Sequence, residues 1–199
     1  MIQFLAELDK EIFLFLNSFH SPFWDKIMWW VSLKYVWVPL YSAVLFFIFY
    51  LRHYKTAIVA LLSLILLVTL TDQTSVHLFK QVFERLRPCH NPDIGHLVHI
   101  VNDKCGGQFG FVSSHAANTF GFATFTSLFF RNRYFSVFIV LWAAIVSYSR
   151  IYLGVHFPGD IIGGMLLGIV SGTIVYRVYS IVVQRIERHR EKHIKSTKS

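Results

Sequence analysis

Long apolar segments separated by short basic turns are the feature that most constrains how this chain can fold. Hydrophobic residues make up 54% of the 199 residues and charged residues only 15%, and the mean hydropathy is +0.49. Such a composition is typical of an integral membrane protein. A helix of about 20 apolar residues is long enough to cross the hydrocarbon core of a bilayer. The sequence therefore predicts an all-α integral membrane protein.

We expect a bundle of about five transmembrane helices in a single domain that spans residues 1–199. The expected spans are approximately residues 24–50, 56–86, 114–130, 134–153 and 158–183. Ahead of them, residues 1–20 place apolar side chains at helical spacing between polar ones, which predicts an amphipathic helix lying in the membrane interface. No internal repeat or linker divides the chain.

Basic residues gather in three places: the turns at residues 52–55 and 131–133, and the tail at residues 185–199. Basic segments next to spans usually face the cytoplasm. The N-terminal helix, the 88–112 loop and the 151–158 turn would then face outward, as in a bacterial inner-membrane protein with a periplasmic site. The tail has no aromatic residues that could stack on bases, so we expect no nucleic-acid partner.

The turn between the last two spans carries a cation, an imidazole and a carboxylate. Arg150 is followed by His156, and Asp160 lies four residues beyond that histidine. A histidine can attack phosphorus when a carboxylate holds its other ring nitrogen, and the planar fork of an arginine suits a phosphate. The alternative is a polar helix start, with Pro158 at the first helical position and the aspartate in the first turn.

Two further stretches lie at the same end of the predicted bundle. Lys80 and Arg87 are seven residues apart, which places them on one face of a continuous helix. As outward-facing cations they break the positive-inside pattern, although two snorkelling side chains would explain them equally well. Ser113, Ser114 and His115 begin the third span. Serines there can cap the helix, and free N–H groups at a helix start can bind an anion.

Together these residues can neutralise an oxyanion and hold attacking and leaving groups in line, as phosphoryl transfer requires. His115 is suited to protonating a leaving oxygen. A metal site is the competing interpretation of clustered histidine and aspartate. Three surrounding cations would repel a metal ion, so we expect no metal and no cofactor.

The order of these motifs resembles the three-part signature of the type 2 phosphatidic acid phosphatase superfamily. The matching pattern runs Lys80-x6-Arg87-Pro88, then Ser113-Ser114-His115, then Ser149-Arg150-x5-His156-x3-Asp160. The superfamily includes membrane lipid phosphatases, soluble acid phosphatases and vanadium haloperoxidases, and the predicted topology resembles the first branch. The middle motif departs from the family's usual Pro-Ser-Gly-His, because Ser114 stands in the glycine position.

The resemblance implies a role for each matching residue. His156 would be the nucleophile that forms a phospho-histidine, Asp160 would orient it, and His115 would protonate the leaving group and then activate water. The remaining residues would hold the phosphate: Lys80, Arg87, Ser113, Ser114 and Arg150. The resemblance implies a metal-independent lipid phosphatase acting on undecaprenyl diphosphate, phosphatidylglycerophosphate, phosphatidic acid or a lipid A phosphate. The alternatives are a membrane protein that binds or transports a phosphate lipid without hydrolysis, and vanadate-dependent haloperoxidase chemistry.

Cys89 and Cys105, the only two cysteines, both lie in the 88–112 loop. In an oxidising compartment we expect them to form a disulfide that braces this loop. Zinc is the alternative, because the same loop contains His90, His96 and His99.

Three other features have expected roles. Asp72, within the second span, is expected to find a structural partner, while His77 either lines the site or fills space. Glycines recur every four residues in the last span, at Gly164, Gly168 and Gly172. Small residues at this spacing let helices approach closely. They favour packing within the chain, with a homodimer contact as the alternative.

Overall fold

The computed structural model of the chain describes residues 2–196, with the side chains of residues 3–190. In this part of the chain the regular structure is helical, apart from one isolated bridge between Leu86 and Phe109. The longer helices are α1 (Ile2–Ser18), α2 (Pro22–Ser32), α3 (Val38–Leu51), α4 (Tyr54–Thr74), α6 (Ser114–Phe130), α7 (Arg133–Tyr152) and α8 (Pro158–Ser196). Short elements join them: η1 (Lys34–Trp37), η2 (Ser75–Lys80), α5 (Gln81–Phe83), η3 (Pro88–His90), η4 (Gly95–Leu97) and η5 (Val101–Asp103).

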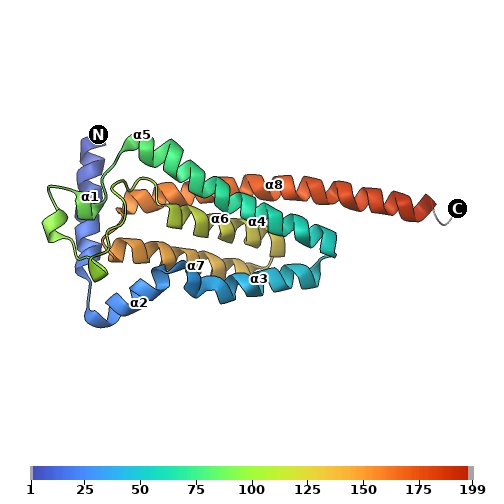
Figure 1. Cartoon of the computed structure of the whole chain (residues 1–199), viewed down its shortest axis with the longest axis horizontal. Helices are drawn as coiled ribbons and strands as arrows, with labels where there is room; N and C mark the ends of the chain where they lie inside the picture. Colours follow the sequence, from blue (N-terminus) through green and yellow to red (C-terminus); the bar gives the residue numbers. More distant parts are fainter. Residues whose placement is uncertain (1, 197–199) are drawn as a thin grey trace.

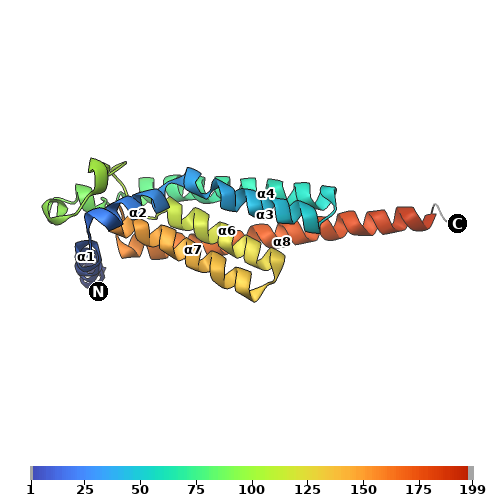
Figure 2. The same cartoon turned by 90° about the horizontal axis from the view of Figure 1, so that it is seen from below.

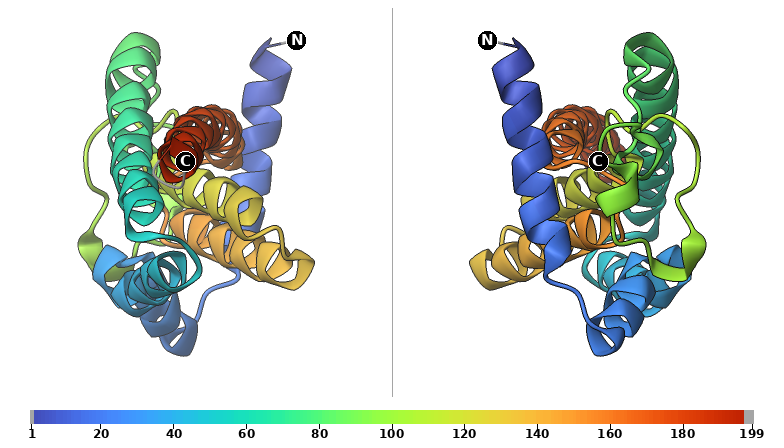
Figure 3. Two further views of the ribbon diagram at one scale, coloured as in Figure 1. Left: turned by 90° about the vertical axis from the view of Figure 1, so that its right-hand side faces the viewer. Right: turned by 90° about the vertical axis from the view of Figure 1, so that its left-hand side faces the viewer.

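Helices α3, α4, α6, α7 and α8 run roughly along one axis, and α1 crosses one end of this bundle (Figure 1). Helix α8 extends well beyond the other helices at the opposite end (Figure 2). Seen end-on, α8 lies between α1 and α4, and the loop that follows α5 lies on the side of α4 (Figure 3). Residues 197–199 of the predicted basic tail, and the side chains from residue 191 onward, lie outside the described part of the chain.

Four helical segments are long and apolar enough to cross a membrane: Lys34–Leu51, Tyr54–Phe83, Arg133–Tyr152 and Pro158–Arg190. The fifth expected span, α6, has only 17 residues and packs against α4, α7 and α8. Its buried residues include Ala116, Ala123 and Phe125, each at 0% exposure. No residue of α6 is exposed, so this helix would contact little lipid. The predicted all-α membrane fold is confirmed.

The expected first span at residues 24–50 is not one helix, and that part of the prediction was wrong. Leu33 ends α2 with an extended backbone conformation (φ −78°, ψ 124°). The short η1 turn and then α3 follow it. The Trp37 indole donates to the Val31 carbonyl at 2.8 Å, which satisfies a group that the break frees. The break places Ser32, at the end of α2, next to the candidate site.

The second span also differs from its prediction. Helix α4 widens into a π-helical segment, η2, and the helix ends at Phe83 because Glu84 takes a left-handed conformation (φ 45°). The Ser75 hydroxyl donates to the Asp72 carbonyl at 2.8 Å, a local bond that competes with the regular helical ladder. Arg87 therefore lies beyond the helix, and the expectation that it shares a helical face with Lys80 was wrong.

The three glycines of α8 pack against α6. A Cβ added at Gly164 would lie 2.5 Å from the Ser113 carbonyl, and one at Gly172 would lie 2.7 Å from the Gly121 carbonyl. Only glycine allows this close backbone approach. Because α6 covers this face, the residues Gly164, Gly168 and Gly172 are not free to form the alternative homodimer contact.

The sidedness of the turns matches the sequence prediction. The α3–α4 and α6–α7 turns, which carry Arg52 and Arg131, lie at the end of the bundle opposite α1 (Figure 1). At the α1 end, the Asn17 amide donates to the Tyr152 carbonyl at 2.8 Å, and its oxygen accepts from the His99 N–H at 2.8 Å. This asparagine joins α1 to both α7 and the 88–112 loop.

Candidate active site

His156 and Asp160 form the buried centre of the site. The Nδ1 of His156 lies 3.3 Å from Oδ2 of Asp160, which also accepts a hydrogen bond from the Phe157 N–H at 3.0 Å. The histidine is 2% exposed and the aspartate 0%. Pro158 begins α8, so the Asp160 carboxylate lies in the first turn of this helix. There it accepts from the free N–H of Phe157, the residue that precedes the helix. With Nδ1 engaged, Nε2 is the ring nitrogen that could attack a substrate.

The other carboxylate oxygen of Asp160 belongs to an ion-pair chain. Oδ1 accepts from the Arg85 guanidinium at 2.9 Å, and the same guanidinium donates to Oδ2 of Asp9 at 2.6 Å. Arg85 also lies over the Phe157 ring, with its central carbon 4.4 Å from the ring centroid. Asp9 comes from α1, which therefore contacts the site directly.

The first and second motifs meet through Lys80 and Ser114. The Lys80 ammonium donates to the Ser114 hydroxyl at 2.8 Å, and Ser75 Oγ lies 2.6 Å from the same hydroxyl. Ser113 is the N-cap of α6, and its N–H donates to the backbone carbonyl of Asp160 at 3.0 Å. This last bond fixes the start of α6 against the start of α8.

The two predicted arginines are held by different segments of the chain, Arg87 by the 88–112 loop and Arg150 by the end of α2. Arg87 donates to the carbonyls of Phe109 (3.3 Å) and Cys105 (3.1 Å), so the 88–112 loop holds it. Arg150 donates through one terminal nitrogen to the Ser32 hydroxyl. Its Nε is buried and has no hydrogen-bond partner among the described residues. A buried donor without a partner is costly, and an anion in the adjoining cavity would supply the missing acceptor.

Two cavities meet at His115. The first, of about 660 Å³, lies against the 88–112 loop and is lined by both charged and apolar side chains. Its lining includes Lys34, His90, Lys104, Cys105, Gly106, His115 and Arg150. The second, of about 450 Å³, lies between α3, α4 and α6 and is mostly apolar. Its lining includes Tyr41, Leu45, Leu61, Leu64, Ile65, Val68 and Phe122. Ser32, Lys34 and His115 line both cavities.

Burial lowers the pKa of the His156 imidazole well below its ordinary value of 6.5, and the positive charges of Arg87, Arg150 and Lys80 lower it further. The three predicted cations thus act on this histidine from three separate segments of the chain. An imidazole with a lowered pKa is neutral at physiological pH, and only the neutral ring has a free electron pair for attack.

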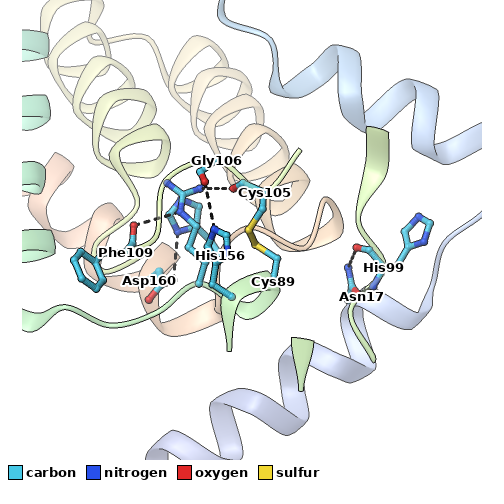
Figure 4. The surroundings of a disulfide bond; sticks show 10 residues. Asn17, Cys89, His99, Cys105, Gly106, Phe109, His156 and Asp160 are labelled. Atoms are coloured by element: carbon cyan, nitrogen blue, oxygen red, sulfur yellow. Dashed lines mark hydrogen bonds and ion pairs between the residues drawn. A yellow bond between two sulfur atoms is a disulfide. The ribbon is translucent and has the colours of Figure 1, made fainter. Parts of the chain in front are cut away.

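The two cysteines lie together at the rim of the site. The Cα atoms of Cys89 and Cys105 are 6.0 Å apart, and Figure 4 draws the two sulfur atoms as bonded. A ring nitrogen of His90 lies within 4.8 Å of both sulfur atoms, close enough for the three to share a metal ion. Its Nε2 is 3.3 Å from the Gly106 carbonyl oxygen. This geometry suits a disulfide, while the neighbouring imidazole keeps the zinc alternative open to test.

Several residues near the site were not assigned a role from the sequence. Arg85 is one of the unspecified positions between Lys80 and Arg87, and neither Asp9 nor Lys34 belongs to a motif. Arg85 lies two residues before Arg87, in a segment with no regular pattern, and only the fold brings Asp9 to it. In the described part of the chain, two other polar side chains that the sequence singled out form no hydrogen bond to the site residues. His77 is exposed and pairs with Gln73 and Gln81, and among the described residues Asp72 forms no ion pair.

Comparison with known proteins agrees with the motifs. The sequence profile of the PAP2 superfamily matches residues 56–183. The chain belongs to the PAP2 superfamily. It is 42% identical to a lipid A 4'-phosphatase of Bacteroides thetaiotaomicron, over 94% of this chain and 84% of the relative. It is 40% identical to a lipid A 4'-phosphatase of Porphyromonas gingivalis, over 89% of this chain and 75% of the relative.

Among solved structures of the PAP2 superfamily, the fold resembles that of LpxE from Aquifex aeolicus. The TM-score is 0.61 at 26% sequence identity, over 84% of this chain and 93% of the solved one. These similarities confirm the predicted family and the predicted class of activity, a membrane lipid phosphatase.

Proposed function

We propose that the protein removes a phosphate from lipid A, through a phospho-histidine formed on His156. The observation that carries the lipid assignment is the pair of cavities that meet at His115. The first cavity can take a phosphorylated headgroup beside the cations Lys34 and Arg150 that line it, while the second, apolar cavity offers a surface for hydrocarbon. Such a combination suits an amphipathic substrate better than a soluble phosphate ester.

The apolar cavity favours hydrolysis of a lipid that stays in the bilayer. It lies between α3 and α4, whose outward faces carry exposed apolar side chains such as Phe46 and Leu62. An acyl chain could therefore enter sideways from the membrane without crossing a polar surface.

The first chemical step forms a bond between Nε2 of His156 and phosphorus and breaks the bond between phosphorus and the lipid oxygen. His115 donates a proton to that oxygen, which leaves as an alcohol. Asp160 holds Nδ1 and stabilises the positive charge that the ring gains. The cations Lys80, Arg87 and Arg150, with the hydroxyl of Ser113 and the N–H of Ser114, balance the charge of the phosphoryl oxygens.

The second step regenerates the enzyme. His115, now neutral, takes a proton from a water molecule, and the resulting hydroxide attacks phosphorus. The bond to His156 breaks, inorganic phosphate leaves, and both histidines return to their starting forms. These two steps need neither a metal ion nor a cofactor. His115 acts once as the acid and once as the base.

The choice of lipid A among the candidate substrates is supported by the two relatives, each named for its action on the 4'-phosphate of lipid A. The 4'-phosphate is therefore the position we propose. We also propose that the site faces the outside of a bacterial inner membrane and that Cys89 and Cys105 form a disulfide there. The positive-inside pattern at Arg52 and Arg131 supports this orientation.

The test of this function is phosphate release by the detergent-purified protein in EDTA. The substrates are lipid A, undecaprenyl diphosphate, phosphatidylglycerophosphate, phosphatidic acid and p-nitrophenyl phosphate. Val68→Trp fills the apolar cavity, because Val68 lines it and is 43% exposed. We expect this variant to lose lipid A hydrolysis about tenfold or more while keeping p-nitrophenyl phosphate hydrolysis. The control is Ile58→Trp, at an equally exposed position of α4 outside the cavity lining.

Faster turnover of another lipid than of lipid A would overturn the substrate assignment. Release from no lipid by a folded sample would overturn the phosphatase assignment and favour lipid binding or transport. Equal behaviour of the two tryptophan variants would show that the apolar cavity does not hold the substrate.

A further inference from the structure

Helix α1 contributes a carboxylate to the centre of the site, although it lies outside residues 56–183, which match the superfamily profile. Asp9 accepts from Arg85 at 2.6 Å through Oδ2, and its Oδ1 accepts from the Gly159 N–H at 2.8 Å. Arg85 in turn donates to Asp160 at 2.9 Å, and Asp160 holds His156. A continuous chain of four charged or titratable groups therefore runs from α1 to the histidine.

The main chain passes close to both carboxylates of this ion-pair network. A Cβ added at Gly159 would lie 2.7 Å from Oδ2 of Asp9, and one at Gly110 would lie 2.8 Å from Oδ2 of Asp160. Two glycines thus let the main chain approach the two carboxylates closely. The side chain of Asp9 is only 14% exposed and that of Asp160 is 0% exposed. Both carboxylates are therefore shielded from solvent, and the Arg85 side chain that joins them is 29% exposed, so salt screens the two ion pairs only in part.

The net charge of Asp9, Arg85 and Asp160 indicates how Asp9 acts on His156. Asp160 and Arg85 alone would sum to zero, which would leave no net negative charge beside His156 when its ring becomes positive. With Asp9 the three groups sum to −1. Asp9 engages the guanidinium from the other side, so that Asp160 keeps its charge for the imidazole.

We propose that Asp9 is a positioning residue for the phosphatase reaction: it shares Arg85 with Asp160 and so maintains the negative charge that His156 needs. The proposal rests on the function proposed above. It makes the interfacial helix α1 part of the catalytic apparatus rather than only a membrane anchor. The position of α1 across the end of the bundle (Figure 1) then determines whether His156 can react, because α1 carries Asp9.

A merely structural role for Asp9 predicts different behaviour. If the carboxylate only attached α1 to the bundle, then removing Asp9 or Arg85 would weaken the same attachment and have effects in the same direction. In the proposed arrangement the two residues have opposite charges and act in opposite directions on His156. The acid limb of the pH profile measures this sign, because it reports protonation of the His156–Asp160 pair.

The experiment compares Asp9→Asn, Arg85→Gln and Asp93→Asn with the unmodified chain. Asp9→Asn preserves shape and leaves Arg85 uncompensated, so we expect about a tenfold lower kcat with little change in KM. The acid limb should move to lower pH by roughly half a unit. Arg85→Gln removes the cation, and the limb should move to higher pH. Asp93 is the matched control, because it joins α1 to the 88–112 loop through Lys10 (3.2 Å) without contacting Asp160.

The same signs are measurable without turnover. The ring resonances of His156, assigned by their absence from His156→Gln, can be titrated by NMR in detergent micelles. We expect a lower pKa of the His156 imidazole in Asp9→Asn and a higher one in Arg85→Gln. Shifts in the same direction, or an unshifted pKa in Asp9→Asn, would overturn the proposal. A titration that follows the expected signs in a protein that hydrolyses no lipid would separate this inference from a failure of the proposed function.

Discussion

The Lys80 ammonium lies 2.8 Å from the Ser114 hydroxyl, so the residue that departs from the usual superfamily motif contacts the first motif directly. A glycine at position 114 could not make this bond. The serine therefore replaces the flexibility of glycine with a hydrogen bond that fixes the lysine. Ser75, from the π-helical segment η2, supports the same hydroxyl at 2.6 Å.

Ser114→Ala should raise KM for the lipid substrate, because Lys80 would lose its fixed position beside the phosphate. A hydrogen bond to a charged group contributes about 1.5 kcal/mol, which corresponds to roughly a tenfold change. Steady-state kinetics would measure this change. Ser75→Ala leaves the bond between Lys80 and Ser114 intact and should have a smaller effect. An unchanged KM in Ser114→Ala would contradict the positioning of Lys80 by this serine.

The lowered pKa of His156 predicts the pH dependence of the reaction. Burial and three cations favour the neutral imidazole, so the nucleophile stays unprotonated as the pH falls through 6.5. We expect kcat/KM to be retained through this value and to decline only at lower pH. Arg87→Gln removes one of the cations, so the decline should begin at a higher pH than in the unmodified protein. A decline centred at or above 6.5 in the unmodified protein would contradict the electrostatic argument.

Most of the helices could be predicted because their signals are local. Helix α7 begins and ends within one residue of its prediction, since Arg131 and Asn132 interrupt the apolar pattern before it and Gly154 follows it. The break at Leu33 could not be predicted in the same way. The nearest helix breaker is Pro39, in the first turn of α3, and the compensation of the break by Trp37 and Arg150 depends on the folded structure.

The site shows the same division between local and long-range information. His156 and Asp160 are four residues apart, and their contact follows from one helix start. Lys80 and Arg87 were predicted as site residues on the argument of a continuous helix, which the π-helical segment and Glu84 interrupt. Asp9 could not be identified, because a lone acidic residue in an amphipathic helix gives no sign of the arginine 76 positions away that it contacts.

The disulfide proposed between Cys89 and Cys105 should stabilise the loop that holds Arg87. A disulfide that closes a loop of 16 residues is expected to contribute about 3 kcal/mol. The Cys89→Ser/Cys105→Ser double variant should therefore unfold at lower temperature. It should also have a higher KM, because the Cys105 carbonyl accepts from Arg87. Thermal unfolding and steady-state kinetics in detergent measure the two effects.

Maleimide labelling distinguishes a disulfide from a zinc site at these cysteines. A disulfide protects both thiols until a reductant is added, and EDTA has no effect on the labelling. Zinc bound by Cys89, His90 and Cys105 would instead be released by EDTA, which would expose the thiols without a reductant. Labelling of the untreated protein would contradict both arrangements.

The two histidines should be separable by the leaving group of the substrate. p-Nitrophenolate leaves without a proton, so His115→Asn should still let His156 attack p-nitrophenyl phosphate. Water attack on the phospho-histidine would then be slow, because no base activates it, and loss of general acid–base catalysis costs about 100-fold or more in rate. We expect one rapid equivalent of p-nitrophenol followed by slow turnover in a stopped-flow measurement. His156→Asn should give neither phase. A burst in His156→Asn, or none in folded His115→Asn, would reverse or remove the roles assigned to the two residues.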